Sequence, residues 1–420
     1  MRQTARANTG RYVSRLTSGT LAVVMAGGRG ERLKALTLHR CKPATPFGGK
    51  FRIIDFVLSN CVNSGIRQIA VLTQYKAQDL IQHIHLGWSY LRGELGEFVE
   101  VIPAQQQIGE HWYRGTADSV YQNLDYLRAH NPPHVLILAG DHIYKMDYGP
   151  MIAYHEQCEA DITVGVVDVP IDRAHEFGIM STDESNRIVR FAEKPKDPEP
   201  IVGHPGLARA SMGIYVIALE RLERLLAEDA ANPASRHDFG RNIIPPAIEG
   251  LRVFAYPFHD IETRAQNYWR DVGSVDAFYE ANMELVQLNP ELNIYDRHWP
   301  IWTYQAQQPP AKFVLDEDGR RGMAVNSMVA GGCIISGAFV RRSLLSSGVH
   351  VEEGTTLDGA VVLPNVTIGR RCQVQQCILD ENCVIPDGLK IGVDAAADQS
   401  RFYRTRSGIT LVTADMLRAL

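Results

Sequence analysis

A six-residue spacing of aliphatic and small side chains runs through the C-terminal part of the chain. Val366, Cys372 and Ile378 are six residues apart, and so are Ile368 and Val374. One inward-facing residue in every six is typical of a triangular solenoid of short strands, with the intervening Asn, Asp and Gly at its corners. We therefore expect residues 323–420 to form a left-handed β-helix of hexapeptide repeats. A plain antiparallel β domain is the alternative.

So short a solenoid leaves the faces at its two ends to be covered. Packing against the preceding domain, or against another copy of the chain, would cover them. The repeat therefore also predicts an oligomer.

The region from residue 21 to residue 288 has a different pattern, in which short apolar runs alternate with segments of helical period. The apolar runs lie at residues 21–26, 68–73, 134–139 and 161–167, and helices are expected at 55–63 and 77–86. A further helix is expected to begin at a Thr116 cap and run through Leu127. Strands that are apolar on both faces, with helices between them, indicate a Rossmann-like α/β domain with a mostly parallel sheet.

Two segments flank this region. Residues 289–322 are rich in Pro, Gln and Asp, which predicts a linker. Residues 1–20 are basic and rich in Ser and Thr, with no acidic residue before Glu31. They are interpreted as a basic N-terminal arm; an organellar transit peptide would have a similar composition.

Composition excludes several classes of protein. The 420 residues carry 43 basic and 48 acidic side chains, which give a net charge of −5. This charge argues against nucleic acid as a binding partner. No apolar run reaches the roughly 18–20 residues of a membrane span. The seven cysteines are scattered and form no Cys-x-x-Cys pair, which argues against a zinc ribbon and favours a reducing, cytoplasmic location.

A glycine-rich loop follows the first expected strand. Gly27, Gly28 and Gly30 surround Arg29, and further basic residues follow at Arg32, Lys34, Arg40 and Lys42. The loop fits neither a dinucleotide fingerprint nor a Walker motif. Glycine N–H groups next to this much positive charge predict a triphosphate site, and a solvated basic loop is the alternative.

Ten stretches in order along the chain carry a resemblance to a known family. They are residues 25–33, 42–43, 47–55, 58–60, 112–118, 138–144, 191–195, 210–215, 237–240 and 269–273. Together they resemble the sugar-phosphate nucleotidyltransferases, and within these the bacterial glucose-1-phosphate adenylyltransferases. The resemblance extends over nearly the whole chain.

The resemblance implies an enzyme that converts ATP and glucose 1-phosphate into ADP-glucose and pyrophosphate, the first committed step of glycogen or starch synthesis. A phosphate oxygen of the sugar attacks the α-phosphorus of ATP. Because that oxygen is already anionic, no catalytic base is needed, and positioning and charge neutralisation should carry the reaction.

The resemblance also implies which residues act. The catalytic residues would be Arg32, Lys42 and Asp141, and Mg²⁺ would lie on Asp141 and Asp271. ATP would be bound by Gly27, Gly28, Arg29, Gly30, Gln105 and Gly115. Glucose 1-phosphate would be bound by Tyr113, Gly178, Glu193, Lys194, Ser211, Tyr215 and Asp238. Trp269 is interpreted either as a site residue or as core packing. Glu31 stands where the wider family has Thr, so its carboxylate should point away from the phosphates.

Members of this family are typically homotetramers regulated by small metabolites bound between the two domains. The implied effector residues are Arg40, Arg52, Arg401 and Arg404. His39 and Thr45 depart from the pattern of members activated by fructose 1,6-bisphosphate, which favours a sugar monophosphate or a small carboxylate here.

Three other functions stay open from the sequence. The enzyme could use a different nucleoside triphosphate. The hexapeptide domain could transfer acyl groups, although its single histidine, His350, has no obvious partner. The chain could be a non-catalytic regulatory subunit, but Arg32, Asp141, Glu193 and Lys194 are all present.

Overall fold

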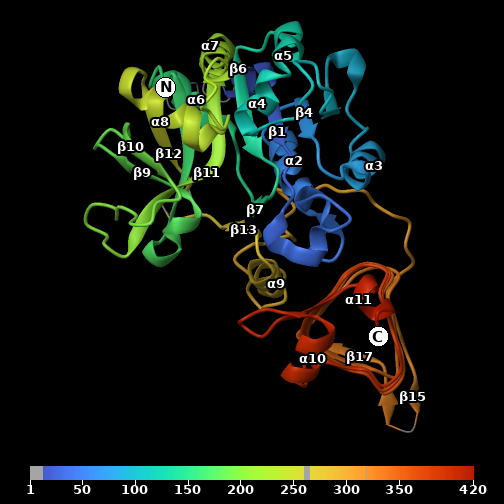
Figure 1. Ribbon diagram of the computed structural model, residues 1–420. Coiled ribbons are helices and arrows are strands. Elements are labelled where there is room, and N and C mark those ends of the chain that lie inside the picture. Colours follow the sequence, from blue (N-terminus) through green and yellow to red (C-terminus); the bar gives the residue numbers. More distant parts are fainter. Residues whose placement is uncertain (1–12, 260–264, 318) are drawn as a thin grey trace, which may run out of the picture.

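The computed structural model describes residues 13–259, 265–317 and 319–420. Figure 1 shows an α/β lobe and, beside it, a solenoid that is triangular in cross-section, with helix α9 (Val275–Glu284) between them. Most of the expected basic arm lies outside the described residues; residues 13–19 form a helix that leads into β1. Within the described ranges, no helix combines the length and apolarity needed to cross a bilayer.

The centre of the α/β lobe is a parallel sheet. Strand β1 (Thr20–Met25) lies between β6 (His134–Ala139) and β4 (Gln68–Thr73), and β5 (Phe98–Pro103) pairs with β4. The first three are the apolar runs that the sequence predicts, and their central residues are buried. Helices must therefore cover both faces of this part of the sheet.

The sheet continues beyond β6 in antiparallel fashion. The long strand β11 (Leu207–Ala218) pairs antiparallel with both β6 and β8 (Ile162–Pro170), and β12 (Val253–Pro257) pairs parallel with β8. Strands β9 (Gly178–Thr182) and β10 (Ile188–Glu193) complete the edge. The sheet is thus mixed, and its parallel half carries the glycine-rich loop.

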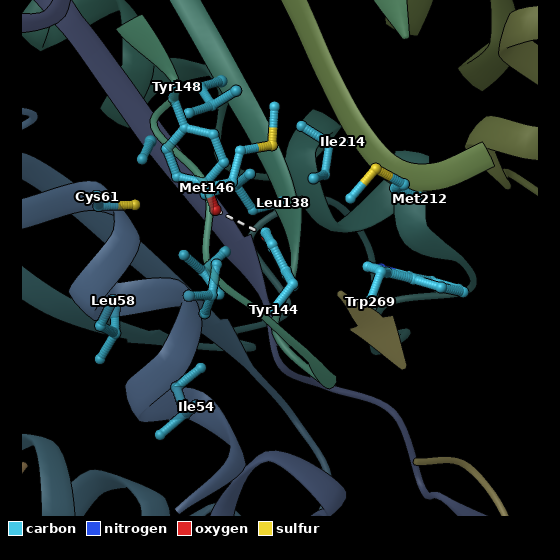
Figure 2. Close-up of a cluster of buried hydrophobic side chains, with 14 of the residues drawn as sticks. Ile54, Leu58, Cys61, Leu138, Tyr144, Met146, Tyr148, Met212, Ile214 and Trp269 are labelled. Carbon is cyan, nitrogen blue, oxygen red and sulfur yellow. Dashed lines mark hydrogen bonds between the residues drawn. The ribbon is translucent and has the colours of Figure 1, made fainter. Parts of the chain in front are cut away.

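Helices lie on both faces of the sheet. They are α2 (Ile53–Asn63), α3 (Gln78–Gly87), α4 (Thr116–Tyr121), α5 (Leu124–His130), α6 (Gly149–Gln157), α7 (Leu219–Ala230) and α8 (Ile244–Gly250). Figure 2 shows one of the two cores between sheet and helices, where the hydroxyls of Tyr144 and Tyr148 share a 2.7 Å hydrogen bond among apolar side chains. This bond satisfies both buried hydroxyls within an apolar cluster.

The prediction of one helix from Thr116 to Leu127 is wrong in both its length and its N-cap. The segment from Thr116 to Leu127 is two helices, α4 and α5, separated by Gln122 and Asn123. Gly115 is the N-cap, and the Thr116 hydroxyl makes no capping bond. That hydroxyl instead donates to Asp238 Oδ2 (3.2 Å), because a partner distant in sequence competes with the local cap.

The C-terminal lobe is a left-handed β-helix built from parallel ladders. Thr356 pairs with Gln373, and Gln373 with Lys390, so successive coils are 17 residues apart. Its strands are β14 (Lys312–Val314), β17 (Met323–Val325), β18 (Met328–Val329), β19 (Ile334–Ser336), β20 (Phe339–Arg341), β21 (Leu344–Leu345), β22 (His350–Val351), β23 (Thr356–Val362), β24 (Thr367–Ile368), β25 (Gln373–Leu379), β26 (Val384–Ile385), β27 (Lys390–Ile391) and β29 (Thr410–Val412). Val366 and Cys372 of the six-residue set lie in the core of the solenoid, as expected for inward-facing positions. The inward position predicted for Ile378 is wrong: its neighbours Cys377 and Leu379 face the interior, and Ile378 is buried in the cluster shared with the α/β lobe. Strand β14, which pairs with β19, comes from residues 289–322.

The remaining elements are short. They are β2 (Pro46–Phe47), β3 (Phe51–Arg52), β7 (His142–Tyr144), β13 (Trp269–Asp271), β15 (Asp316–Glu317), β16 (Arg320–Arg321), β28 (Tyr403–Arg404), α10 (Ala395–Arg401) and α11 (Ala414–Arg418), with short 3-10 turns at Glu31–Thr37, Lys42–Ala44, Gly93–Leu95 and Ile171–Glu176 and a π-helical turn at Phe239–Ile243. All seven cysteines are free thiols.

The two lobes share an apolar core. Phe47 and Phe278 of the first lobe belong to one buried cluster with Val361 and Ile378 of the solenoid. The Tyr279 hydroxyl donates to the carbonyl oxygen of Gly359 at 2.7 Å. Helix α9 therefore fixes the solenoid beneath the segment that follows the glycine-rich loop (Figure 1).

Candidate active site

A cavity of about 320 Å³ opens where the parallel strands β1 and β6 end. Open α/β sheets bind ligands at the carboxyl ends of their strands. Among the lining residues are several that the sequence predicts, namely Gly27, Gly28, Gly30, Lys42, Tyr113, Gly115 and Asp141. The glycine-rich loop and the first turn of α4 thus face one another across the cavity.

Gly30 must be glycine for two reasons. Its φ of 66° lies in the left-handed region, and a Cβ there would sit 3.0 Å from Lys42 Cβ. The loop can therefore pass directly against Lys42, which brings its N–H groups and the lysine to the same cavity.

Lys42 joins two carboxylates that lie 130 residues apart in the chain. Its Nζ is 2.9 Å from Asp141 Oδ2 and 2.7 Å from Asp271 Oδ1. Asp141 follows β6, and Asp271 ends β13, where it lies opposite His142 of β7 in the antiparallel ladder. Cross-strand neighbours project from the same face of a sheet, which explains why these groups converge.

Among the described residues, Asp141, His142 and Asp271 form a group of possible metal ligands whose ligand atoms all lie within 4.8 Å of one another. Carboxylate oxygens suit a hard divalent cation. The Lys42 ammonium already lies between the two carboxylates, so this space accommodates positive charge. The residues present therefore fit a divalent cation. Sequence reasoning missed His142, although it directly follows Asp141.

The charges of this cluster stabilise one another. Burial alone would lower the pKa of Lys42, but Asp141 and Asp271 raise it above its usual value. Burial would raise the pKa of both carboxyls, but Lys42 and His142 hold the pKa of each below its usual range. The lysine is therefore an ammonium and both aspartates are carboxylates at neutral pH.

Arg32 lies at the edge of the same cluster. One of its terminal nitrogens is 3.0 Å from Asp271 Oδ2 and the other is 3.4 Å from Glu176 Oε2. The side chain is about half exposed, so it can reach a ligand in the cavity. Arg29 is 72% exposed and lies 4.0 Å from the exposed Glu31. Neither Arg29 nor Arg32 is among the residues that line the cavity.

The residues expected to bind the sugar phosphate gather around the ends of β9 and β10. Gly178 pairs with Glu193 in this ladder, and a Cβ on Gly178 would lie 2.8 Å from Glu193 Oε2. Lys194 follows with its Nζ 3.7 Å from Glu193 Oε1 and about half exposed. Burial raises the pKa of Glu193, and Lys194 opposes that shift.

Strand β11 and the π-helical turn at Phe239–Ile243, with Asp238 as its N-cap, complete this group. Strand β11 has an irregular register between Ser211 and Tyr215, and the Ser211 hydroxyl accepts from the N–H of Gly213 at 3.2 Å. The Tyr215 ring stacks on Phe239 at 5.5 Å, and burial raises the pKa of its hydroxyl. Asp238 accepts from the N–H of Arg241 at 3.1 Å.

Gln105 is exposed and does not line the cavity. Gln74, which the sequence analysis missed, does. Its side chain accepts from the Tyr113 N–H at 2.6 Å and donates to the Tyr113 carbonyl at 3.3 Å, which fixes that wall of the cavity. Its position directly after β4, at the ligand edge of the sheet, is the signal that could have found it.

Trp269 is buried and packs on His142, with ring centroids 4.9 Å apart, and on Phe177 at 5.4 Å. Its indole Nε1 has no hydrogen-bond partner among the described residues. Of the two interpretations, core packing behind the metal-ligand group fits its position. Figure 2 shows it next to Met212 at the edge of the core.

The four expected effector residues do not come together. A second cavity, of about 530 Å³, lies between the lobes, and Arg52 lines it together with Lys50, His83, Ser347 and Asn365. The other three arginines are not among its lining residues.

Arg40 is buried and forms ion pairs with Asp380 (2.9 Å) and Glu381 (2.8 Å) of the solenoid. Arg401 and Arg404 contact the buried carboxylate of Asp398 instead, at 3.2 and 3.9 Å.

Comparison with known proteins agrees with this architecture. The model of the family described as Nucleotidyl transferase matches residues 21–287, and that of the family described as GlmU-like, C-terminal hexapeptide matches residues 309–412. The chain belongs to the nucleotidyl transferase family.

Its relatives carry a more particular name. The chain is 58% identical over 407 residues to a glucose-1-phosphate adenylyltransferase of Methylococcus capsulatus, covering 97% of this chain and 96% of the relative. It is 58% identical to glucose-1-phosphate adenylyltransferase 2 of Alkalilimnicola ehrlichii and 57% identical to the enzyme of that name from Nitrosococcus oceani, with the same coverage. The resemblance predicted from the motifs is confirmed.

Proposed function

We propose that the chain is a glucose-1-phosphate adenylyltransferase, which forms ADP-glucose and pyrophosphate from ATP and α-D-glucose 1-phosphate for glycogen synthesis. One observation carries the chemistry: Lys42, Asp141 and Asp271 converge beside the glycine-rich loop. The name shared by relatives of nearly the same length supports the choice of substrates.

On the nucleotide side, the N–H groups of Gly27, Gly28 and Gly30 bind the phosphates of ATP. Arg32 and Lys42 neutralise the charge that builds on the leaving pyrophosphate. Asp141 and Asp271 hold Mg²⁺, with His142 beside them. When bound, this ion supplies further positive charge to the phosphate oxygens.

On the sugar side, Lys194 binds the phosphate of glucose 1-phosphate as a point charge. Glu193 accepts hydrogen bonds from glucose hydroxyls, and Tyr113, Ser211, Tyr215 and Asp238 shape the pocket. The attacking phosphate oxygen is already anionic, so none of these residues has to remove a proton. Their work is to bring two polyanions together in line.

The rest of the chain regulates and assembles the enzyme in this proposal. Residues 21–288 catalyse, residues 289–322 connect, and residues 323–420 regulate and form a homotetramer in the cytoplasm. The cavity between the lobes, with Lys50 and Arg52 in its wall, takes a sugar monophosphate or a small carboxylate as effector.

A pyrophosphate-release assay tests the proposal. The protein is incubated with glucose 1-phosphate, Mg²⁺ and each of ATP, UTP, dTTP and GTP in turn, and then with ATP in the presence of EDTA. Turnover with ATP that disappears with EDTA supports the assignment. Faster turnover with another triphosphate would make the chain a different sugar-phosphate nucleotidyltransferase, and no turnover with any would favour a regulatory subunit.

A further inference from the structure

A buried histidine–aspartate pair lies behind the candidate active site. His237 Nδ1 is 2.7 Å from Asp229 Oδ2, and the two side chains are only 4% and 6% exposed. Because a carboxylate can only accept, Nδ1 must carry the proton. The other oxygen of Asp229, in the last turn of α7, accepts from the Ser235 hydroxyl at 2.5 Å, so both oxygens are used.

The backbone of His237 packs behind Gly115, which lines the nucleotide cavity. Its φ of 54° lies in the left-handed region, which is uncommon for a residue other than glycine. Its carbonyl accepts from the N–H of Ala117 at 2.7 Å, and a Cβ on Gly115 would clash with the same carbonyl. The conformation of His237 therefore sets how closely this segment approaches the wall of the cavity at Gly115.

The next residues reach the sugar side. The Phe239 N–H donates to the Thr116 hydroxyl at 3.0 Å, and the Phe239 ring stacks on Tyr215. A Cβ on Gly240 would lie 2.7 Å from Glu193 Oε2. Within four residues, the chain thus touches the wall of the nucleotide cavity and the carboxylate expected to bind glucose.

We propose that His237 and Asp229 are positioning residues that set the spacing between the nucleotide and the sugar phosphate. The inference rests on the proposed function. The hydrogen bond to Asp229 holds His237 in its left-handed conformation, and that conformation places the 237–240 segment between the two substrates. An in-line displacement is sensitive to such spacing, since a shift of about 1 Å costs about 100-fold in rate.

The variants His237→Ala, His237→Asn and His237→Gln separate this role from a structural one. The amide nitrogen of Asn is as many bonds from Cα as Nδ1 of His, so Asn can donate the same hydrogen bond, and Asn tolerates a positive φ. The amide nitrogen of Gln is one bond further from Cα. We expect His237→Ala and His237→Gln to lower kcat/KM for glucose 1-phosphate by about 100-fold. His237→Asn should stay within about threefold of the natural chain.

A matched control exists at the other end of β6. His134 is also buried, and its Nε2 lies 2.6 Å from Glu156 Oε1, but it is at the strand end away from the cavity. His134→Ala should lower the melting temperature about as much as His237→Ala, with KM and kcat unchanged. Asp229→Ala, which removes the acceptor of the Nδ1–H bond, should resemble His237→Ala, and the double variant should lose no more than either single one, as for two residues acting as a unit.

Equal kinetic losses for His237→Asn and His237→Ala would overturn the proposal, as would a loss in His134→Ala as large as that in His237→Ala. If His237→Ala does not fold, Asp229→Ala and His237→Gln decide the question by the same criteria. If the proposed function itself is wrong, the unmodified chain will form no ADP-glucose, which distinguishes that outcome from a failure of the His237–Asp229 proposal.

Discussion

The ammonium of Lys42 lies 2.7 Å from Asp271 Oδ1. A cation of the chain itself therefore neutralises the carboxylates that we propose to hold Mg²⁺. The same lysine touches Asp141 and packs against Gly30, so one side chain connects the metal ligands to the phosphate-binding loop.

Removing this cation should make the folded chain depend on added metal. In Lys42→Met, Asp141 and Asp271 lose the ammonium that they share, and only Asp271 keeps a second cation, Arg32. The change should destabilise the protein by about 3–5 kcal/mol. Mg²⁺ should then raise the melting temperature of Lys42→Met more than that of the unmodified chain. Lys312→Gln, at an exposed position, is the control. Identical Mg²⁺-induced shifts in all three proteins would argue against a cation site here.

Neutralising either proposed ligand should abolish most of the activity. Asp141→Asn and Asp271→Asn should each lower turnover by about 100- to 1,000-fold, because charge stabilisation of the transition state is lost. Circular dichroism should show an intact fold. Asp125→Asn, at a highly exposed position, is the control and should keep full turnover. Normal turnover in Asp141→Asn would remove that residue from the mechanism.

Lys194 should contribute to one substrate only. Lys194→Gln should raise KM for glucose 1-phosphate by about 10- to 100-fold, since a charge-assisted hydrogen bond to phosphate is lost. KM for ATP should change by less than about twofold. The neighbouring exposed lysine gives the control, Lys196→Gln. If only the KM for ATP rose, Lys194 would bind ATP rather than glucose 1-phosphate, and the assignment would be wrong.

Arg40 should stabilise the contact between the two lobes. Its guanidinium is buried against Asp380 and Glu381, and these carboxylates raise its pKa although burial opposes them. Arg40→Met should lower the free energy of unfolding by about 3–5 kcal/mol in urea denaturation. Arg224→Met breaks an exposed pair with Glu220 and should cost less than about 1 kcal/mol. A stable Arg40→Met that has lost only its response to effectors would contradict this and support the effector role expected from the sequence.

Stability should fall in mild acid because of His155. Burial, together with the nearby His134, lowers its pKa to about 4. Between about pH 6.5 and pH 4 the unfolded chain binds a proton that the folded chain does not, so stability decreases as the pH falls through this window. The loss should approach about 3 kcal/mol at its lower end. Urea midpoints at pH 7 and pH 5 should differ less in His155→Asn than in the unmodified chain; an unchanged difference would contradict this.

The sequence predicts those features that depend on local periodicity. The apolar runs at 21–26 and 68–73 predict buried parallel strands because a strand covered on both faces has no polar alternation. The six-residue spacing of Val366 and Cys372 predicts the solenoid because both residues lie in its core, whereas Ile378, in the same register, is buried against the α/β lobe. The motif order leads to several residues that line the cavity, among them Gly27, Lys42 and Asp141.

The features that the sequence does not predict depend on contacts between residues that are far apart in the chain. Arg40 looks like an anion-binding residue until Asp380, 340 positions later, is found beside it. Thr116 looks like a helix cap, but it bonds to Asp238. Gln105 lies in the expected motif region, yet Gln74 from the neighbouring strand end lines the cavity. In each case a tertiary contact replaces the local one that sequence reasoning assumes.

We propose that Asp141 and Asp271 hold one divalent cation beside the glycine-rich loop. The most direct measurement is anomalous X-ray scattering from crystals of the chain grown with Mn²⁺ and a non-hydrolysable ATP analogue. We predict a single strong anomalous peak between the carboxylates of Asp141 and Asp271, and its absence in Asp271→Asn. A peak elsewhere, or one that persists undiminished in Asp271→Asn, would contradict the account.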